Sequence, residues 1–400
     1  MIAFLGLLVL HGCGAALRHL ATRCGFGVAL RSPASLFVAL AVAYACALGW
    51  PGAVLLIGWA LVARRESVAP MPPREAGVWL GVTALVLARP WVPTHWDEFV
   101  WLAKARFGSL GFSAGIDAAL DPAQHLIPAG YPPLWSLAVG WLSWGRDDVG
   151  AHVLAASLLV LACAAVAVEA WREELSALPK WSVLVLVAAP LVLVHFRSTY
   201  VDLPVGLLGL GLLGLLLRGS VFPSVALAIV LAGFKDEGLA HVLAATAAAF
   251  FFAAPRRWAL FGPAVAAFLT VAVWRVLVRT SGVNLFDHAL GWPAWGEAPR
   301  LLQLFVMHAT DFSSWGVFWS VVVAVLVSRT GSRSAHALRV MVLANLLFTF
   351  AAILMGPERV RVFAENGTLL NRLLVQLWPC AVTLLLSALR PSPPLTDRGA

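Results

Sequence analysis

The sequence consists of apolar runs of membrane-spanning length, separated by short polar breaks almost from end to end. A bilayer core of about 30 Å requires about 20 predominantly apolar residues per helix. Of the 400 residues, 61% are hydrophobic and 12% are charged, whereas soluble domains carry about 45–50% apolar and about 25% charged residues. The chain is therefore expected to fold as an all-α, polytopic transmembrane helix bundle without a large soluble domain.

The basic residues gather in short breaks at the ends of the apolar runs, where they orient a membrane protein. The net charge of +8 is therefore attributed to topology, and nucleic acid is not expected as a partner. The breaks assigned to the cytoplasm are residues 18–23, 63–74, 255–258 and 328–339 and the tail from Arg390. Arginine far outnumbers lysine, as in bacteria with GC-rich genomes. The expected location is the bacterial cytoplasmic (inner) membrane.

Threading helices between these breaks predicts about 11 to 13 helices, at roughly 20 residues for each crossing. Residues 1–75 are expected to form N-terminal membrane helices, starting with an uncleaved helix at residues 2–17, and residues 391–400 a cytoplasmic tail. The main transmembrane module covers residues 76–390. Its expected crossings are residues 76–91, 149–171, 181–197, 203–218, 221–234, 238–254, 259–278, 312–327, 337–355 and 373–389.

This threading places the polar segments that hold most of the potentially reactive groups on the outer side. They are residues 93–133, 195–202, 234–238 and 356–372, joined by an aromatic loop at 280–300. An ionisable residue at membrane level costs about 2.5–3.5 kcal/mol on insertion scales, so such residues usually line a cavity or a pathway. The five cysteines show no CxxC or metal-ligand spacing, so neither a disulfide framework nor a zinc site is expected.

Two carboxylates, Asp97 and Glu98, follow His95 and Trp96 in the first large outer loop, in the stretch "VPTHWDEFVWLAKARF". They have a local structural explanation, because acidic side chains favour the first turn of a helix. An interfacial helix would then begin here, and Lys104 and Arg106 would complement its far end. The alternative is that these carboxylates belong to a reaction site.

Three further outer residues also have a structural and a functional explanation. Asp202 precedes Leu-Pro and is placed to cap a helix. In "FKDEG", Lys235 could pair with an acid in a solvated turn that Gly238 closes, although the flanking apolar runs keep these charges near the membrane surface. Tyr131, in "AGYPPLW", lies where prolines start a helix and could face a site.

Arg372 begins the last apolar run from the outer side. The positive-inside rule disfavours a purely topological arginine in that position. The guanidinium group is suited to bidentate binding of phosphate. A phosphate-binding role and a structural role remain open for this residue.

The ordered set "HWDE", "YPPLW", "STYVDLP", "FKDEG" and "RLLVQLWP" resembles the GT-C superfamily of integral membrane glycosyltransferases, the group that includes protein O-mannosyltransferases and aminoarabinose transferases. The similarity runs from about Pro90 to Pro379. It implies a GT-C-like catalytic module over residues 76–390, with interfacial helices in the outer loop 93–133. The chain departs from the family pattern in having two or three helices before the motif loop and no sizeable domain after the last helix.

The resemblance implies transfer of a sugar from a polyprenyl-phosphate donor to a lipid, glycan or protein acceptor at the outer face. The catalytic role falls on Asp97, with Glu98 as the neighbouring candidate. The residues implied in substrate binding are Tyr131, Tyr200, Asp202, Lys235, Glu237 and Arg372, with Lys235 and Arg372 as candidates for the lipid phosphate. A divalent cation is a candidate cofactor, with His95 and Asp97 as its candidate ligands. Direct displacement would invert the anomeric configuration.

Two other functions remain open at this point. Charged residues at membrane level also mark the path of a transporter or flippase, although the sequence contains no convincing internal repeat. A ligase or polymerase of polysaccharide chains also uses lipid-linked sugars, usually with a large late outer loop rich in Arg and His. The late loop here, residues 356–372, is short.

Overall fold

The computed structural model describes residues 34–49, 96–124, 130–143, 146, 148–172, 174, 190–196, 198–252, 260–283, 291–328, 331–365 and 367–388. Within these ranges every regular element is a helix. Most of residues 1–75, the expected crossing at 76–91, His95 and the tail 391–400 lie outside them. The total of 11 to 13 helices therefore stays a prediction.

Among the described residues, four helices are long and apolar enough to cross a membrane: α8 (Val149–Ala170), α15 (Phe261–Thr280), α19 (Arg333–Met355) and α21 (Thr368–Ala388). Shorter apolar helices are α2 (Ala34–Ala47), α12 (Asp202–Leu217), α13 (Val221–Phe234), α14 (Glu237–Phe252) and α18 (Phe318–Val327). The expected all-α architecture is confirmed for the described residues, and these helices indicate a membrane protein.

The expected crossings agree with the observed helices to within a few residues from position 202 onward, with one exception. The apolar run 312–327 forms two pieces, α17 (Phe312–Trp315) and α18. Gly316 separates them with φ = 57°, a left-handed conformation that glycine adopts without steric cost. A run that was predicted as a single crossing therefore bends in its first third.

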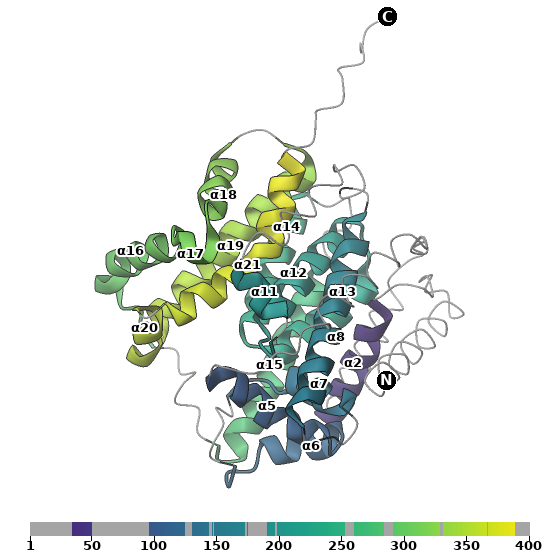
Figure 1. Cartoon of the computed structure of the whole chain (residues 1–400). Coiled ribbons are helices and arrows are strands. Elements are labelled where there is room, and N and C mark those ends of the chain that lie inside the picture. The colour runs from purple at the N-terminus through teal and green to yellow at the C-terminus, as the bar shows by residue number, and fades with distance from the viewer. Residues whose placement is uncertain are drawn as a thin grey trace, which may run out of the picture.

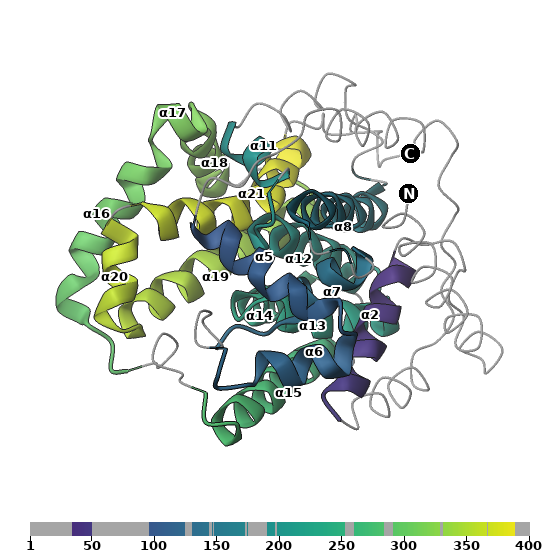
Figure 2. The same ribbon diagram turned by 60° about the horizontal axis from the view of Figure 1, so that its bottom comes forward.

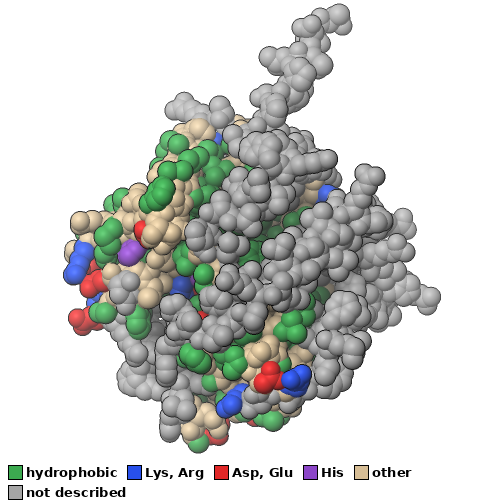
Figure 3. All heavy atoms as spheres, viewed as in Figure 1, with side chains coloured by type: hydrophobic (Ala, Val, Ile, Leu, Met, Phe, Trp, Pro, Cys, Tyr) green, Lys and Arg blue, Asp and Glu red, His purple; other side chains and the backbone are tan. Residues whose placement is uncertain are grey.

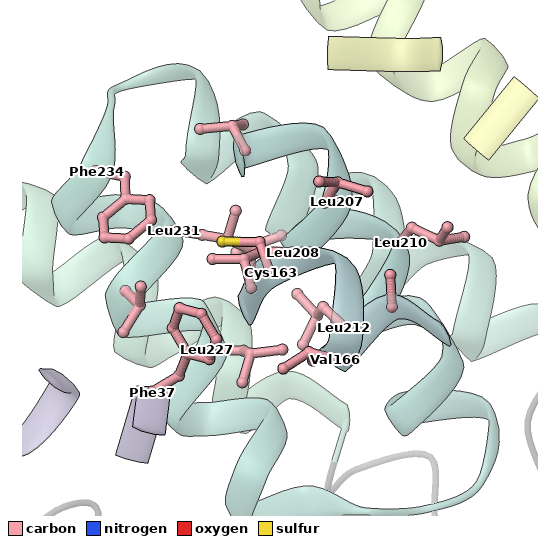
Figure 4. Close-up of a cluster of buried hydrophobic side chains, with 14 of the residues drawn as sticks. Phe37, Cys163, Val166, Leu207, Leu208, Leu210, Leu212, Leu227, Leu231 and Phe234 are labelled. Carbon is pink, nitrogen blue, oxygen red and sulfur yellow. The ribbon is translucent and has the colours of Figure 1, made fainter. Parts of the chain in front are cut away.

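Helix α12 forms the centre of the bundle and packs against α8, α13, α14 and α21. Around this centre, α13 contacts α15 and α2, and α14 contacts α19 (Figure 1). Leucines of α12 meet Cys163 and Val166 of α8, Leu227 and Leu231 of α13, and Phe37 of α2 in one buried cluster (Figure 4). This hydrophobic centre fixes the relative positions of the helix ends that carry the charged residues.

Glycine allows α12 and α21 to approach each other closely. A Cβ atom on Gly206 would overlap the backbone carbonyl of Gln376 on α21. The neighbouring atom is backbone and cannot move aside as a flexible side chain would. Small residues at such crossings let helix backbones pack directly, which is a common way to join membrane helices. The first turns of α12 and the middle of α21 are thereby held together.

The segment that the sequence analysis assigned to the first outer loop contains two short helices, α5 (Trp96–Gly108) and α6 (Phe112–Ala119), and is followed by α7 (Leu134–Leu142). Helix α5 packs against α7, and both lie beside the same end of the bundle (Figures 1 and 2). Asp97 and Glu98 fall in the first turn of α5 and Arg106 in its last turn, as the local structural explanation predicted. Helix α7 starts directly after the prolines of "YPPLW".

Replacing Gly206 by alanine is expected to destabilise the bundle, because the new methyl group forces α12 and α21 apart. Overpacking of this kind typically costs about 1–3 kcal/mol. Thermal unfolding of the detergent-solubilised protein measures the effect as a lower midpoint. The matched control is Gly296→Ala, since a Cβ atom there meets nothing within 4 Å. Equal midpoints for the two variants would contradict the close helix crossing.

Candidate functional site

The charged residues of three separate sequence motifs meet at one end of the bundle. The carboxylate of Asp202 accepts a hydrogen bond from Lys235 Nζ at 2.9 Å on one oxygen and from Arg372 Nε at 2.8 Å on the other. The amide of Gln376 donates a third hydrogen bond to this carboxylate, at 2.8 Å. Lys235 Nζ also contacts Glu237 Oε1 at 2.8 Å. We call Asp202, Lys235, Glu237 and Arg372 the ion cluster.

The side chain of Asp202 bonds to the other residues of the ion cluster and does not cap helix α12 (Asp202–Leu217). Val201 occupies the N-cap position of α12 without a side-chain hydrogen bond, and Asp202 is the first helical residue. The capping explanation for Asp202 is therefore wrong. Asp202 is fully buried, and buried charges require paired or hydrogen-bonded partners. The two cations and the amide supply them.

The "FKDEG" segment connects α13 and α14 through Lys235 and Asp236 alone. It is not a solvated turn, because Lys235 is 2% exposed, and Gly238 lies within α14, where a Cβ atom would overlap the backbone of Leu231. Lys235 has an extended backbone, with φ = −163° and ψ = 153°. Its side chain turns into the cluster, whereas Asp236 pairs with Arg275 of α15 at 2.6 Å.

Burial and neighbouring charge act in opposite directions on Lys235. Removal from water lowers the pKa of its ammonium group, but Asp202 and then Glu237 raise it, and the net pKa lies above the ordinary lysine value. Opposite charges at hydrogen-bond distance favour the charged form. Lys235 is therefore a permanent cation of the site.

Aromatic rings lie over the cations. The guanidinium carbon of Arg372 is 5.2 Å from the ring centre of Tyr200, which also stacks on His195 at 4.9 Å. Lys235 Nζ is 5.8 Å from the ring centre of Tyr131. Cations at these distances are attracted to the negative face of the ring. The two tyrosines that the resemblance implied in substrate binding thus lie against the ion cluster.

Tryptophan indoles hold the two tyrosine segments against the bundle. Trp135 of α7 donates to the carbonyl of Thr199 at 2.9 Å, one residue before Tyr200. Trp274 of α15 donates to the carbonyl of Gly130 at 3.1 Å, one residue before Tyr131. Each bond satisfies an indole nitrogen that would otherwise be buried without a partner. Both tyrosines are therefore positioned by long-range contacts of α7 and α15.

Helix α5 brings a second lysine to Tyr131. Lys104 Nζ is 5.5 Å from the Tyr131 ring centre and 5.6 Å from that of Trp101. Burial lowers the pKa of Lys104 to about 7, opposed by the charge of Asp236. Burial, followed by the charge of Glu237, raises the pKa of Tyr131 to about 12. The phenol is therefore a hydrogen-bond donor throughout the physiological pH range.

The start of α5, which carries the two carboxylates Asp97 and Glu98, contacts the segment before Tyr200. Glu98 is fully buried, and its backbone carbonyl accepts a hydrogen bond from the hydroxyl of Thr199 at 3.2 Å. The side chain of Asp97 lies outside the described part of the structure, so its catalytic role stays a prediction. The same holds for His95 as a metal ligand. Elsewhere, among the described residues, no group of three or more His, Cys, Asp or Glu side chains could hold a metal ion.

Two contributors to the site did not stand out in the sequence. Gln376 lies four residues after Arg372 on α21, and this spacing places both side chains on one helix face. The sequence feature that could have pointed to Gln376 is its polar amide inside an apolar run. Lys104 was interpreted as a partner for the far end of α5, but it lies 3% exposed beside Tyr131. The sequence feature that could have pointed to Lys104 is its position three residues after Trp101, on the same face of α5.

Substituting Asp202 by alanine is expected to destabilise the protein strongly, because two cations at a buried carboxylate lose their shared partner. Breaking a buried ion pair from one side typically costs about 3–5 kcal/mol. Unfolding midpoints in detergent measure the loss. Glu365→Gln is the control, because it breaks the exposed Arg300–Glu365 pair, and such pairs contribute about 0–1 kcal/mol. A double variant, Asp202→Ala with Lys235→Met, should be less destabilised than the sum of the single variants.

Lys104→Met is expected to change how stability depends on pH. The lysine pKa is 10.5 in the unfolded chain and about 7 in the folded protein, so the folded state disfavours the ammonium form. The cost is complete below pH 7 and disappears as the pH rises from 7 to 10.5. The midpoint of the variant should exceed that of the wild-type protein most clearly at pH 6, and the difference should shrink by pH 9. A difference that grows with pH would contradict this environment for Lys104.

Comparison with known proteins gives no relative for this chain. No protein-family model, no curated protein and no solved structure matches it.

Proposed function

We propose that this protein is a membrane glycosyltransferase that moves a sugar from a polyprenyl-phosphate donor to an acceptor at the extracytoplasmic face. The observation that carries the proposal is the ion cluster. Four charged side chains that are up to 170 residues apart meet at one end of the apolar helices. Charged groups at the edge of a membrane are costly and usually functional.

The two cations of the cluster suit a lipid phosphate. Arg372 is 18% exposed, whereas Lys235 lies at 2%, so an incoming phosphate would meet the guanidinium first and the ammonium behind it. Both groups are already oriented by Asp202. Cations fixed in advance where negative charge develops stabilise a leaving group strongly. This assigns phosphate binding to Arg372 and Lys235, and their positioning to Asp202.

Glu237 offers an acceptor for a hydroxyl group. Its side chain is 27% exposed, and one carboxylate oxygen contacts Lys235. The other oxygen, Oε2, is buried and has no hydrogen-bond partner among the described residues. A buried acceptor without a partner is costly, and a sugar hydroxyl would satisfy it. The partly exposed ring of Tyr131 lies against the ion cluster and would contact the sugar, while the buried ring of Tyr200 supports Arg372.

The reaction itself would be a direct displacement at the anomeric carbon. A carboxylate takes the proton of the acceptor hydroxyl, the new glycosidic bond forms, and the bond to the lipid phosphate breaks. The phosphate leaves with the electron pair, next to Arg372 and Lys235. By family resemblance the base is Asp97, with Glu98 beside it, and the product has inverted configuration. A divalent cation stays a candidate cofactor.

Asp97→Asn is expected to reduce sugar transfer by at least about 100-fold, because a positioned general base contributes about 10²–10⁴-fold. Mass spectrometry of lipids and glycans from a deletion strain first identifies the missing product and hence the donor. Transfer by the purified protein in proteoliposomes is then measured with that donor. Glu365→Gln, in an exposed ion pair, serves as the folded control and should retain full activity.

One outcome would remove the assigned base, and two others would assign a different function. Full transfer by Asp97→Asn would remove Asp97 as the base. If the wild-type protein moves a lipid-linked sugar across the bilayer without transferring it, the protein is a flippase, and the ion cluster lines a translocation path. A deletion strain that accumulates complete but unjoined chains would indicate a ligase or polymerase.

A further inference from the structure

A segment on the outer side of the bundle exposes apolar side chains on a helix that is also amphipathic. This segment, the outer arm, comprises residues 291–315, with η4 (Trp295–Glu297), α16 (Ala298–Ala309) and α17. Helix α16 lies at the edge of the molecule beside α20 (Glu358–Glu365), away from α2 and α8 (Figures 1 and 2). It does not belong to the site described above.

Helix α16 has one buried side and a wide exposed side. The buried side packs on the protein: Leu301 joins a small core with Ile353, Leu354, Ala364, Leu370 and Leu373. On the exposed side Leu302, Val306 and Met307 are 58%, 56% and 52% exposed. Arg300 lies at the far edge of this side and pairs with Glu365 at 2.9 Å. In water, the exposed side of a helix would normally be polar, so these three apolar residues need a covering surface.

The exposed apolar surface continues from the arm to helices that face outward from the bundle. Phe312 in α17 and Val317 next to it are 74% and 64% exposed. Helix α18 continues with exposed valines, and α19, a candidate membrane span, exposes Leu347 at 68%. Hydrophobic side chains cover the surface over α18, while charged groups gather where α16 meets α20 (Figure 3). This continuity favours the bilayer over a second protein as the covering surface.

Two exposed tryptophans indicate how deep the outer arm lies in the membrane. Trp292 and Trp295 are 96% and 70% exposed. The backbone N–H groups of Gly291 and Ala294 donate to the carbonyls of Met355 and Leu354 at 2.7 and 3.0 Å, which pins the tryptophans beside the outer end of α19. That helix has 23 residues, or about 35 Å, enough to span the about 30 Å hydrocarbon core. Its end therefore lies at the membrane–water interface, where tryptophan is enriched.

We infer that the outer arm lies flat in the outer membrane interface, with Leu302, Val306 and Phe312 in the acyl region and Trp292 and Trp295 among the headgroups. Helices with one apolar and one polar exposed face bind in this way. Trp315 donates to Asn371 Oδ1 at 3.2 Å, one residue before Arg372. The arm thus fixes the first turn of α21, and with it the ion cluster, at headgroup depth.

Site-directed spin labelling of the full-length protein in nanodiscs tests this placement. One nitroxide is attached through Val306→Cys and, as the matched control at the charged edge of the exposed side, through Arg300→Cys, in a variant with the five natural cysteines replaced by alanine. At position 306 oxygen should relax the label more strongly than a water-soluble nickel chelate, and at position 300 the order should reverse. Chelate access at 306 equal to that at 300 would place the arm in water. Protection of 306 from both reagents would place it against protein, and either result overturns the inference.

A second measurement leaves the natural cysteines in place. Lipids brominated near the headgroup should quench part of the tryptophan fluorescence of the wild-type protein. The double variant Trp292→Phe with Trp295→Phe should lose a large share of this quenching while keeping its unfolding midpoint. An unchanged quenched fraction would mean that these two indoles do not contact the lipid headgroup region, and the inference would fail.

Discussion

The carboxylate of Asp202 holds together the end of the bundle that carries the ion cluster. It is fully buried and joins Lys235, Arg372 and Gln376, which belong to the α13–α14 connection and to α21. Like charges on Lys235 and Arg372 would repel each other in a medium of low dielectric constant. With Asp202 between them the two cations can stay close together, oriented and charged. The same contact therefore supports the packing of α12 on α21 and prepares the site for an anion.

The site combines rigid and accessible parts. Asp202 and Lys235 are buried, whereas Arg372 and Glu237 are partly exposed, so the second pair is open to solvent while the first pair maintains the geometry. Tryptophans on α7 and α15 fix the segments that carry Tyr200 and Tyr131. Groups held by helices and by supporting hydrogen bonds are positioned more precisely than groups on free loops. This arrangement is what an enzyme that discriminates between lipid-linked sugars would require.

Much of the fold could be predicted from the sequence, because apolar length alone defines a membrane helix. The boundaries of α12, α13 and α14 were predicted to within about two residues, since charged residues end each run. The contacts between motifs could not be predicted, because Asp202 and Arg372 are 170 residues apart and pair only after α12 and α21 pack. The break at Gly316 was also missed, since a left-handed glycine leaves no trace in an apolar pattern. Whether Asp97 reaches the ion cluster stays a prediction.

The short connection between α13 and α14 contacts two different helices. Successive side chains of an extended chain point to opposite sides, so Lys235 turns toward Asp202 while Asp236 turns toward Arg275 of α15. Lys235 and Asp236 thus link α12 and α15, which both pack against α13, through one short connection. An anion that contacts Lys235 would lie one peptide bond away from the Asp236–Arg275 ion pair. The candidate site is thus connected through the chain to α15, a helix that contributes no charge to it.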